Sequence, residues 1–166
     1  MGFTSRVAAC GYFGVVRVRS DLPDLPAAKV KTMLRGLPAA HGYQVSVKPL
    51  RYRDRPHLSA WTDFDAREIV LQVPRPFFPF GEVVAHAAKR RPGKGLRFIW
   101  ITEGVTFRTY RQVLRFLYLH EWMHWYLKER LGKASRAETA CDRFALRNFR
   151  RRTVTESDAA MALVHR

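Results

Sequence analysis

The sequence predicts a single domain of the α+β class, and three observations support this prediction. The chain has 166 residues, of which 47% are hydrophobic and 27% charged, the size and composition of one folded domain. Segments rich in β-branched and aromatic residues, typical of strands, recur between residues 11 and 102. Residues 110–131 form a helical pattern that is apolar almost all round, which is typical of a helix buried in a core.

The first half of the chain contains short elements that are separated by Pro and Gly. The strands are identified by β-branched and aromatic residues or by alternation, as at Val45 and Val47. In chain order we expect a strand at 11–18, a short helix at 27–37, a strand at 43–49, and the two arms of a hairpin at 59–64 and 68–73 that turns at 65–67.

The second half is more regular. Thr109 and Gln112 have the spacing of a helix capping box, and Gly132 stands where a left-handed helix stop is expected, so they bound the long apolar helix. In chain order we expect a helix at 82–89, a strand at 96–102, the long helix at 110–131 and a second helix at 135–150, with no element assigned to the tail at 151–166.

Several protein classes are excluded by the sequence. Two cysteines, Cys10 and Cys141, do not make a disulfide scaffold. There is no apolar run of about 18 residues that would cross a membrane. The first 20 residues lack the apolar stretch and cleavage site of a signal peptide. We therefore expect a cytoplasmic protein with reduced thiols and no membrane contact.

The charge of the chain is strongly basic. Thirty Lys and Arg residues face 14 Asp and Glu residues, a formal net charge of +16. Nucleic acid or an acidic protein as a partner and a merely solvated basic surface are about equally expected from this excess. Two clusters supply candidate phosphate contacts. They are Lys89, Arg90 and Arg91, continuing to Lys94 and Arg97, and Arg147, Arg150, Arg151 and Arg152.

The long helix contains the string His120-Glu121-Trp122-Met123-His124, an H-E-x-x-H motif. Residues four apart share one face of a helix, so His120 and His124 can direct nitrogens to one metal ion. Glu121 lies at the edge of that face and can act as general base on a metal-bound water. Burying these polar groups without a partner would cost several kcal/mol, and a metal ion supplies the partner. The motif therefore predicts a catalytic zinc site.

A third ligand is expected from the second helix. Glu138 and Asp142 are four residues apart, so we expect Glu138 to complete a His₂Glu site for one Zn²⁺ per chain and Asp142 to orient a ligand histidine. A competing reading makes Ser135 and Glu138 a capping box, and Asp142 would then be the ligand. Cys141 is expected to be a small buried hydrophobe rather than a ligand.

These residues resemble a known group of enzymes. Residues 115–127, RFLYLHEWMHWYL, resemble the active-site helix of zincin peptidases, and residues 137–145, AETACDRFA, resemble the gluzincin helix that carries E-x-x-x-D. The most similar small members are the ImmA/IrrE-type metallopeptidases and minimal gluzincins. The SprT-like proteases are similar in the first helix, but their third ligand is a histidine. The resemblance covers about residues 96–148.

The resemblance implies a zincin-like arrangement, in which a small mixed sheet packs on the active-site helix and a second helix brings the third ligand. An edge strand, supplied by 96–102 or by 68–73, would face the cleft and bind an extended peptide. Within the one domain, 1–95 would hold the sheet, 96–150 the metal-binding core and 151–166 the tail.

The residue that stabilises the transition state is left open. Tyr118 and Tyr126 are expected to point away from the metal face. Tyr110, His86 and His57 are candidates, each with a structural role as the alternative.

The sequence thus favours a zinc-dependent endopeptidase that hydrolyses peptide bonds with a metal-activated water. The similar ImmA/IrrE-type and SprT-like proteases act on DNA-associated proteins, which implies such substrates here. Two alternatives are a basic nucleic-acid-binding module and a pseudo-protease, each with a structural or degenerate zinc site.

Overall fold

The computed structural model describes residues 17–93, 95, 97–133 and 137–164. The expected strand residues 11–16 and the expected helix start at 135 lie outside the described residues. The elements, in chain order, are β1 (Arg17–Ser20), α1 (Ala27–Leu34), β2 (Gln44–Leu50), β3 (Ser59–Asp63), β4 (Glu68–Pro74), β5 (Phe80–Arg90), β6 (Phe98–Phe107), α2 (Tyr110–Trp125), the π-helical turn η1 (Tyr126–Arg130), α3 (Glu138–Asn148) and α4 (Glu156–Val164).

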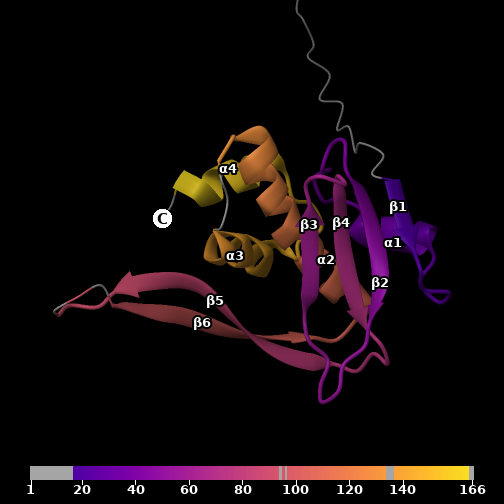
Figure 1. Ribbon diagram of the computed structural model, residues 1–166, viewed down its shortest axis with the longest axis horizontal. Coiled ribbons are helices and arrows are strands. Elements are labelled where there is room, and N and C mark those ends of the chain that lie inside the picture. Colours follow the sequence, from indigo (N-terminus) through magenta and orange to yellow (C-terminus); the bar gives the residue numbers. More distant parts are fainter. Residues whose placement is uncertain (1–16, 94, 96, 134–136, 165–166) are drawn as a thin grey trace, which may run out of the picture.

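The main sheet has four strands in the order β1-β2-β4-β3. Strands β1, β2 and β4 run parallel, and β3 runs antiparallel to β4 (Figure 1). Val45 pairs with Ile69 and Val47 with Leu71, and all four side chains are fully buried on the face that packs against α2. The expected α+β fold is confirmed, and the alternation of Val45 and Val47 is the local reason that β2 faces the core.

The hairpin expected at 59–73 is confirmed as β3 and β4. Its turn is held by Asp63, whose Oδ1 accepts hydrogen bonds from the backbone N–H groups of Asp65 and Ala66 at 3.0 and 2.8 Å. Arg67 closes the turn with a φ of 52°. The expectation that 68–73 supplies a free edge is wrong, because β4 lies between β2 and β3. The edge that borders α2 is β3.

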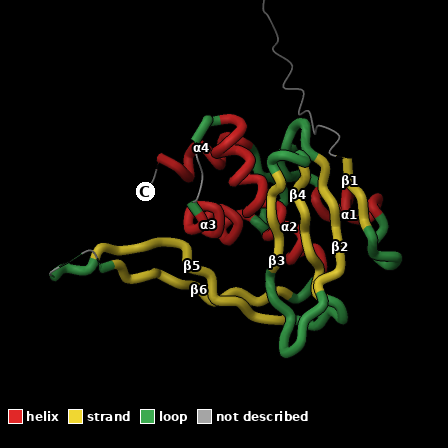
Figure 2. The backbone as a smooth tube through the Cα atoms, in the orientation of Figure 1, coloured by secondary structure: helices red, strands yellow, loops and turns green. Residues whose placement is uncertain are grey.

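The expected helix at 82–89 is also wrong. These residues belong to β5, which pairs antiparallel with β6 along almost its whole length. The alanines of this segment favour a helix locally. Pairing with the strongly β-prone segment 98–107 satisfies the backbone of both strands, and this non-local gain decides the structure. Figure 2 shows the result, a long two-stranded ribbon that extends away from the helices and the main sheet.

Helix α2 is the centre of the molecule. It begins at the expected cap, where Thr109 Oγ1 accepts a hydrogen bond from the Gln112 N–H at 3.3 Å. It passes into the π-helical turn η1, and Gly132 follows with a φ of 61°, the left-handed stop that the sequence predicts. Eleven of its sixteen residues are buried, which confirms the all-round apolar pattern.

Arg115 ties α2 to two other parts of the chain. It is 1% exposed, and among the described residues no carboxylate forms an ion pair with it. Burial lowers the pKa of this guanidinium to about 10. Its N–H groups donate instead to backbone carbonyls, those of Met33, Arg35, Phe149, Arg151 and Arg152. The charge is thereby solvated by the end of α1 and by the segment between α3 and α4.

The tail, for which the sequence suggests no element, contains α4. Its start is a capping box: Thr155 N–H donates to Asp158 Oδ2 at 2.8 Å, and Asp158 N–H donates to Thr155 Oγ1 at 3.4 Å. Within the described residues, no helix is long and apolar enough to cross a membrane.

Candidate metal centre

His120 and His124 lie one turn apart on α2 and turn toward each other. Their Nε2 atoms are 3.1 Å apart, and their side chains are only 14% and 13% exposed. The helical period alone places the two rings on one face. The other sides of α2 are buried, so the side that carries the two histidines is the one that can be reached from solvent.

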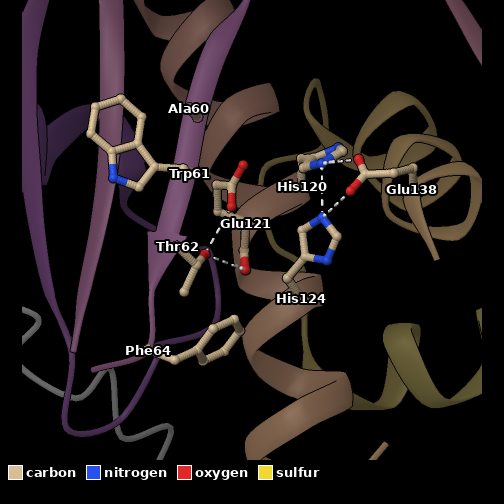
Figure 3. Close-up of a pocket in the computed structure, with 8 residues that line it drawn as sticks. All are labelled: Ala60, Trp61, Thr62, Phe64, His120, Glu121, His124 and Glu138. Carbon is tan, nitrogen blue, oxygen red and sulfur yellow. Dashed lines mark hydrogen bonds and ion pairs between the residues drawn. The ribbon is translucent and has the colours of Figure 1, made fainter. Parts of the chain in front are cut away.

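Glu138, the first residue of α3, brings a carboxylate to both imidazoles. Its Oε2 lies 3.2 Å from His120 Nε2 and its Oε1 lies 3.3 Å from His124 Nε2 (Figure 3). Helix α3 has Ala137 at its N-cap, with no side-chain cap hydrogen bond. Ser135, the partner in the competing capping box, lies outside the described residues. The Glu138 carboxylate itself is directed at the histidines.

The spacing of these atoms fits a single metal ion. One nitrogen from each histidine and one carboxylate oxygen all lie within 4.8 Å of one another. In a tetrahedral site with bonds of 2.0–2.1 Å, neighbouring ligand atoms are about 3.3–3.4 Å apart. The 3.1 Å between the two Nε2 atoms is close to this value, and each oxygen of the Glu138 carboxylate lies 3.2 or 3.3 Å from one of the two nitrogens. The His-His-Glu group is therefore close enough to hold one divalent ion.

Asp142 orients the first of these histidines. One turn after Glu138 on α3, its Oδ1 lies 2.8 Å from His120 Nδ1. A carboxylate in this position accepts the Nδ1–H and leaves Nε2 for the metal. Burial by itself would lower the pKa of His120, but Asp142 and Glu138 outweigh it and raise the pKa to about 10. In return, His120 lowers the pKa of Glu138.

Glu121 lies beside the His-His-Glu group, called the metal group below, and is not one of its members. It is 5% exposed, and its Oε2 accepts a hydrogen bond from the hydroxyl of Thr62 at 2.8 Å. Burial raises the pKa of its carboxyl above the usual range. A buried carboxylate with a raised pKa next to a metal group is the arrangement expected of a general base.

Two pockets open on either side of this group, and β3 runs along both. The site-facing residues His120 and Glu121 line both pockets. One pocket is completed by Ala60, Trp61, Thr62, Phe64, His124 and Glu138. The other is completed by Leu58, Ser59, Ala60, Phe116, Leu117 and Asp142. Two pockets that share Ala60, His120 and Glu121 therefore border the edge strand.

Trp61 and Thr62 are the site residues that sequence reasoning missed. They lie in an ordinary strand with no motif. The packing of β3 on α2 brings the Thr62 side chain to Glu121, whereas the Trp61 ring points to the other side of the strand (Figure 3). The sole available signal was the position of this strand at the end of the hairpin, which makes it a candidate edge.

The remaining candidates lie elsewhere. The Tyr118 hydroxyl donates to the Pro38 carbonyl at 2.7 Å, and Tyr126 stacks on Trp122 with ring centroids 5.1 Å apart, so both point away from the metal group as expected. Tyr110 packs on Phe77. His57 and His86 are absent from the lining of the two pockets.

Cys141 is fully buried, and burial raises the pKa of its thiol, as expected of a small hydrophobic residue. It does not belong to the group of possible ligands among the described residues.

The two basic clusters occupy separate parts of the molecule. Lys89, Arg90 and Arg91 lie at the outer end of the β5–β6 ribbon. Arg150, Arg151 and Arg152 lie between α3 and α4, where Arg150 stacks over the Phe149 ring and Arg151 forms an ion pair with Asp158 at 3.0 Å. The second cluster is thus partly engaged within the fold.

Comparisons with known proteins do not assign this chain to a family: no protein-family model, curated protein or solved structure matches it. The case for a function therefore comes from the geometry of the site.

Proposed function

We propose that this protein is a zinc-dependent endopeptidase. The observation that carries the proposal is the convergence of His120, His124 and Glu138 on one point, with the buried carboxylate of Glu121 beside it and an open cleft in front. Two imidazoles and one carboxylate are the protein ligands of many catalytic zinc sites, which leave a further position for water or substrate.

Zinc bound there would supply Lewis-acid chemistry that polarises a carbonyl and acidifies water. The chain's own residues have distinct tasks. His120, His124 and Glu138 hold the ion, and Asp142 fixes the ring of His120 through Nδ1. Glu121 accepts on its carboxylate a proton from the water that attacks the peptide carbonyl and delivers it to the leaving amine. The hydroxyl of Thr62 holds that carboxylate in place.

The substrate is proposed to be an extended peptide segment that lies against β3. On the side away from β4, no described strand pairs with β3, so its backbone N–H and C=O groups are available to a peptide. Phe64 provides apolar surface beside His124 and Glu138, whereas the Trp61 ring points to the other side of β3 (Figure 3). This lining favours a substrate with an apolar side chain next to the cleaved bond.

The test is cleavage of a fluorescently labelled unfolded protein. The purified chain should contain about one zinc per molecule and should cleave, whereas Glu121→Gln should keep the zinc and lose at least about 100-fold in kcat/KM. Glu103→Gln makes the same chemical change at an exposed residue of β6 and should leave both unchanged.

Cleavage retained by Glu121→Gln would contradict the role of this residue as the base. Zinc binding without cleavage of any unfolded protein would favour the pseudo-protease alternative. The basic surface extends the proposal to proteins associated with nucleic acid.

A further inference from the structure

The outer half of the β5–β6 ribbon extends beyond a hydrogen bond that anchors the ribbon to α3. At the bulge between Ala85 and Ala87, the carbonyl of His86 accepts a hydrogen bond from Arg143 Nη1 of α3 at 3.0 Å. Five residues lead from this anchor to Arg91, which is about 17 Å of strand. Figure 1 shows this part of the ribbon extending past α3.

This projecting part carries cations without acidic neighbours. Between Glu82 and Glu103 the sequence contains no Asp or Glu and five Lys or Arg residues. The four described cations among them, Lys89, Arg90, Arg91 and Arg97, are exposed. Among the described residues, none of their side chains forms an ion pair or a hydrogen bond.

One face of the same strands displays two aromatic rings. Arg90 pairs with Phe98 and Ala88 with Trp100, so these four side chains share a face, while Lys89 and Ile99 share the opposite one. Phe98 is 56% exposed and Trp100 is 59% exposed. Opposite Trp100, the small side chain of Ala88 leaves the indole uncovered.

The spacing of the two rings suits bases that are not paired. Phe98 and Trp100 are two residues apart on one strand, which separates them by about 6.8 Å, twice the rise of about 3.4 Å per nucleotide in a duplex strand. Bases in a duplex are stacked on one another and hide their faces. Bases in a single strand can separate and stack on exposed aromatic rings while cations contact the phosphates.

We propose that the basic hairpin tip, formed by Lys89, Arg90, Arg91, Arg97, Phe98 and Trp100, is a binding site for single-stranded nucleic acid. The cations neutralise the phosphates, and the rings of Phe98 and Trp100 stack on two bases. This site is separate from the metal centre and does not depend on the proposed peptidase activity. It would hold a nucleic acid, and proteins attached to it, beside the helix that carries Glu138.

The test is fluorescence anisotropy of the full-length protein with a labelled 20-nucleotide oligothymidine and with a 20-base-pair duplex. The single strand should bind more tightly than the duplex at equal salt. Changing Lys89, Arg90 and Arg91 together to Gln should weaken binding of the single strand and reduce the slope of log affinity against log salt by about 2, since about 0.7 counterion is released per phosphate contact.

The control for charge is the triple change of Arg51, Arg53 and Arg55 to Gln, which removes equal charge from an exposed loop in another part of the molecule. It should leave most of the affinity and the slope intact. Equal losses in both triple variants would overturn the site, because binding would then follow net charge alone.

The control for stacking lies on the same strand. Trp100→Ala and Phe98→Ala should each weaken binding about tenfold, and Trp100→Phe should retain most of the affinity. Ile99 is 52% exposed on the opposite face of the strand, so Ile99→Ala should change the affinity less than twofold.

Three further outcomes would overturn the proposal. In the first, the protein binds single strand and duplex equally well and the substitutions of Phe98 and Trp100 do not change the affinity. In the second, polyglutamate displaces the oligonucleotide completely. In the third, the protein self-associates through Phe98 and Trp100 and binds no nucleic acid. Glu121→Gln should bind oligothymidine normally, so failure at the metal centre is distinguishable from failure at the hairpin tip.

Discussion

The hydroxyl of Thr62 on the edge strand β3 donates a hydrogen bond to the Glu121 carboxylate on α2 at 2.8 Å. The same hydroxyl lies 3.4 Å from the Glu121 backbone carbonyl. The strand proposed to bind substrate and the residue proposed to move protons are therefore in direct contact. This pairing makes Thr62 a positioning residue rather than a catalytic one, because it acts through Glu121.

Replacing Thr62 should separate positioning from metal binding. Thr62→Val keeps the shape of the side chain but removes the hydrogen bond, so we expect kcat to fall about tenfold. Zinc content and KM should change little. Thr62→Ser should restore most of kcat, because the hydroxyl returns. Steady-state kinetics with metal analysis checks this, and loss of zinc from Thr62→Val would show that the residue supports the metal site instead.

The two carboxylates of α3 should differ in their effect on the metal. Glu138→Gln removes a charged ligand, so we expect zinc binding to be lost at micromolar free zinc. Asp142→Asn removes only the acceptor behind His120, and the expected loss of zinc affinity is about 10–100-fold. Competition with a fluorescent zinc chelator measures both. Equal affinities for Glu138→Gln and the unchanged protein would favour the reading of Glu138 as a helix cap.

Metal removal should destabilise the fold. A ligand present at about 100 times its Kd contributes about 2.7 kcal/mol, and each kcal/mol shifts Tm by about 2–4 °C in a domain of this size. Chelation should therefore lower Tm by several degrees, and added zinc should restore it. The His120→Ala variant is the control, since its Tm should not respond to zinc. A matching response in that variant would place the stabilising ion elsewhere.

Removing the guanidinium of Arg115 should weaken the core strongly. Arg115→Met keeps the length of the side chain but leaves up to five carbonyls, one in a buried and four in part-buried hydrogen bonds, without their donor, so we expect a loss of about 3–5 kcal/mol. Arg111→Met, at an exposed position of the same helix, should cost less than about 0.5 kcal/mol. Urea unfolding followed by tryptophan fluorescence measures both.

If Arg115→Met does not fold, Arg115→Lys provides the comparison. It keeps the charge but cannot satisfy so many carbonyls, and its loss should fall between those of the other two variants. A loss no greater than that of Arg111→Met would contradict the role of Arg115 as a tie between α2 and its neighbours.

The capping box of α4 should make part of the stability depend on pH. Burial opposes the effect, but hydrogen bonds from Thr155 and the ion pair with Arg151 lower the pKa of Asp158. A lowered pKa means that this stabilisation is present at pH values above the unfolded pKa of about 3.9 and is lost as the pH falls through the folded value.

Asp158→Ala should therefore cost about 1 kcal/mol at pH 7, and the difference from the unchanged protein should shrink below about pH 4. Asp54→Ala, at an exposed position, should show no such difference. Chemical denaturation at pH 7 and pH 3 checks the sign, and a difference that grew at low pH would contradict it.

Local patterns were sufficient for several elements. The Thr109 cap, the apolar sides of α2 and the stop at Gly132 are contained in one stretch of chain, so sequence predicts that helix well. The segment 82–89 failed for the opposite reason. Its alanines favour a helix, and only its partner β6 makes it a strand. The capping box at Thr155 and Asp158 had a readable spacing, although the sequence interpretation assigned no element there.

For the residues of the metal group, too, local sequence predicts one part of the arrangement and contacts between distant segments decide the rest. Sequence by itself determined that His120 and His124 share a face, because the period of a helix requires it. It also predicted Glu138 and Asp142 on one face of α3, but not where that face would point. Only the tertiary structure decided that α3 lies against α2, that β3 rather than β4 is the free edge, and that Thr62 meets Glu121. Those relations depend on contacts between distant segments, and the free energy of such contacts is not encoded in any local window of the chain.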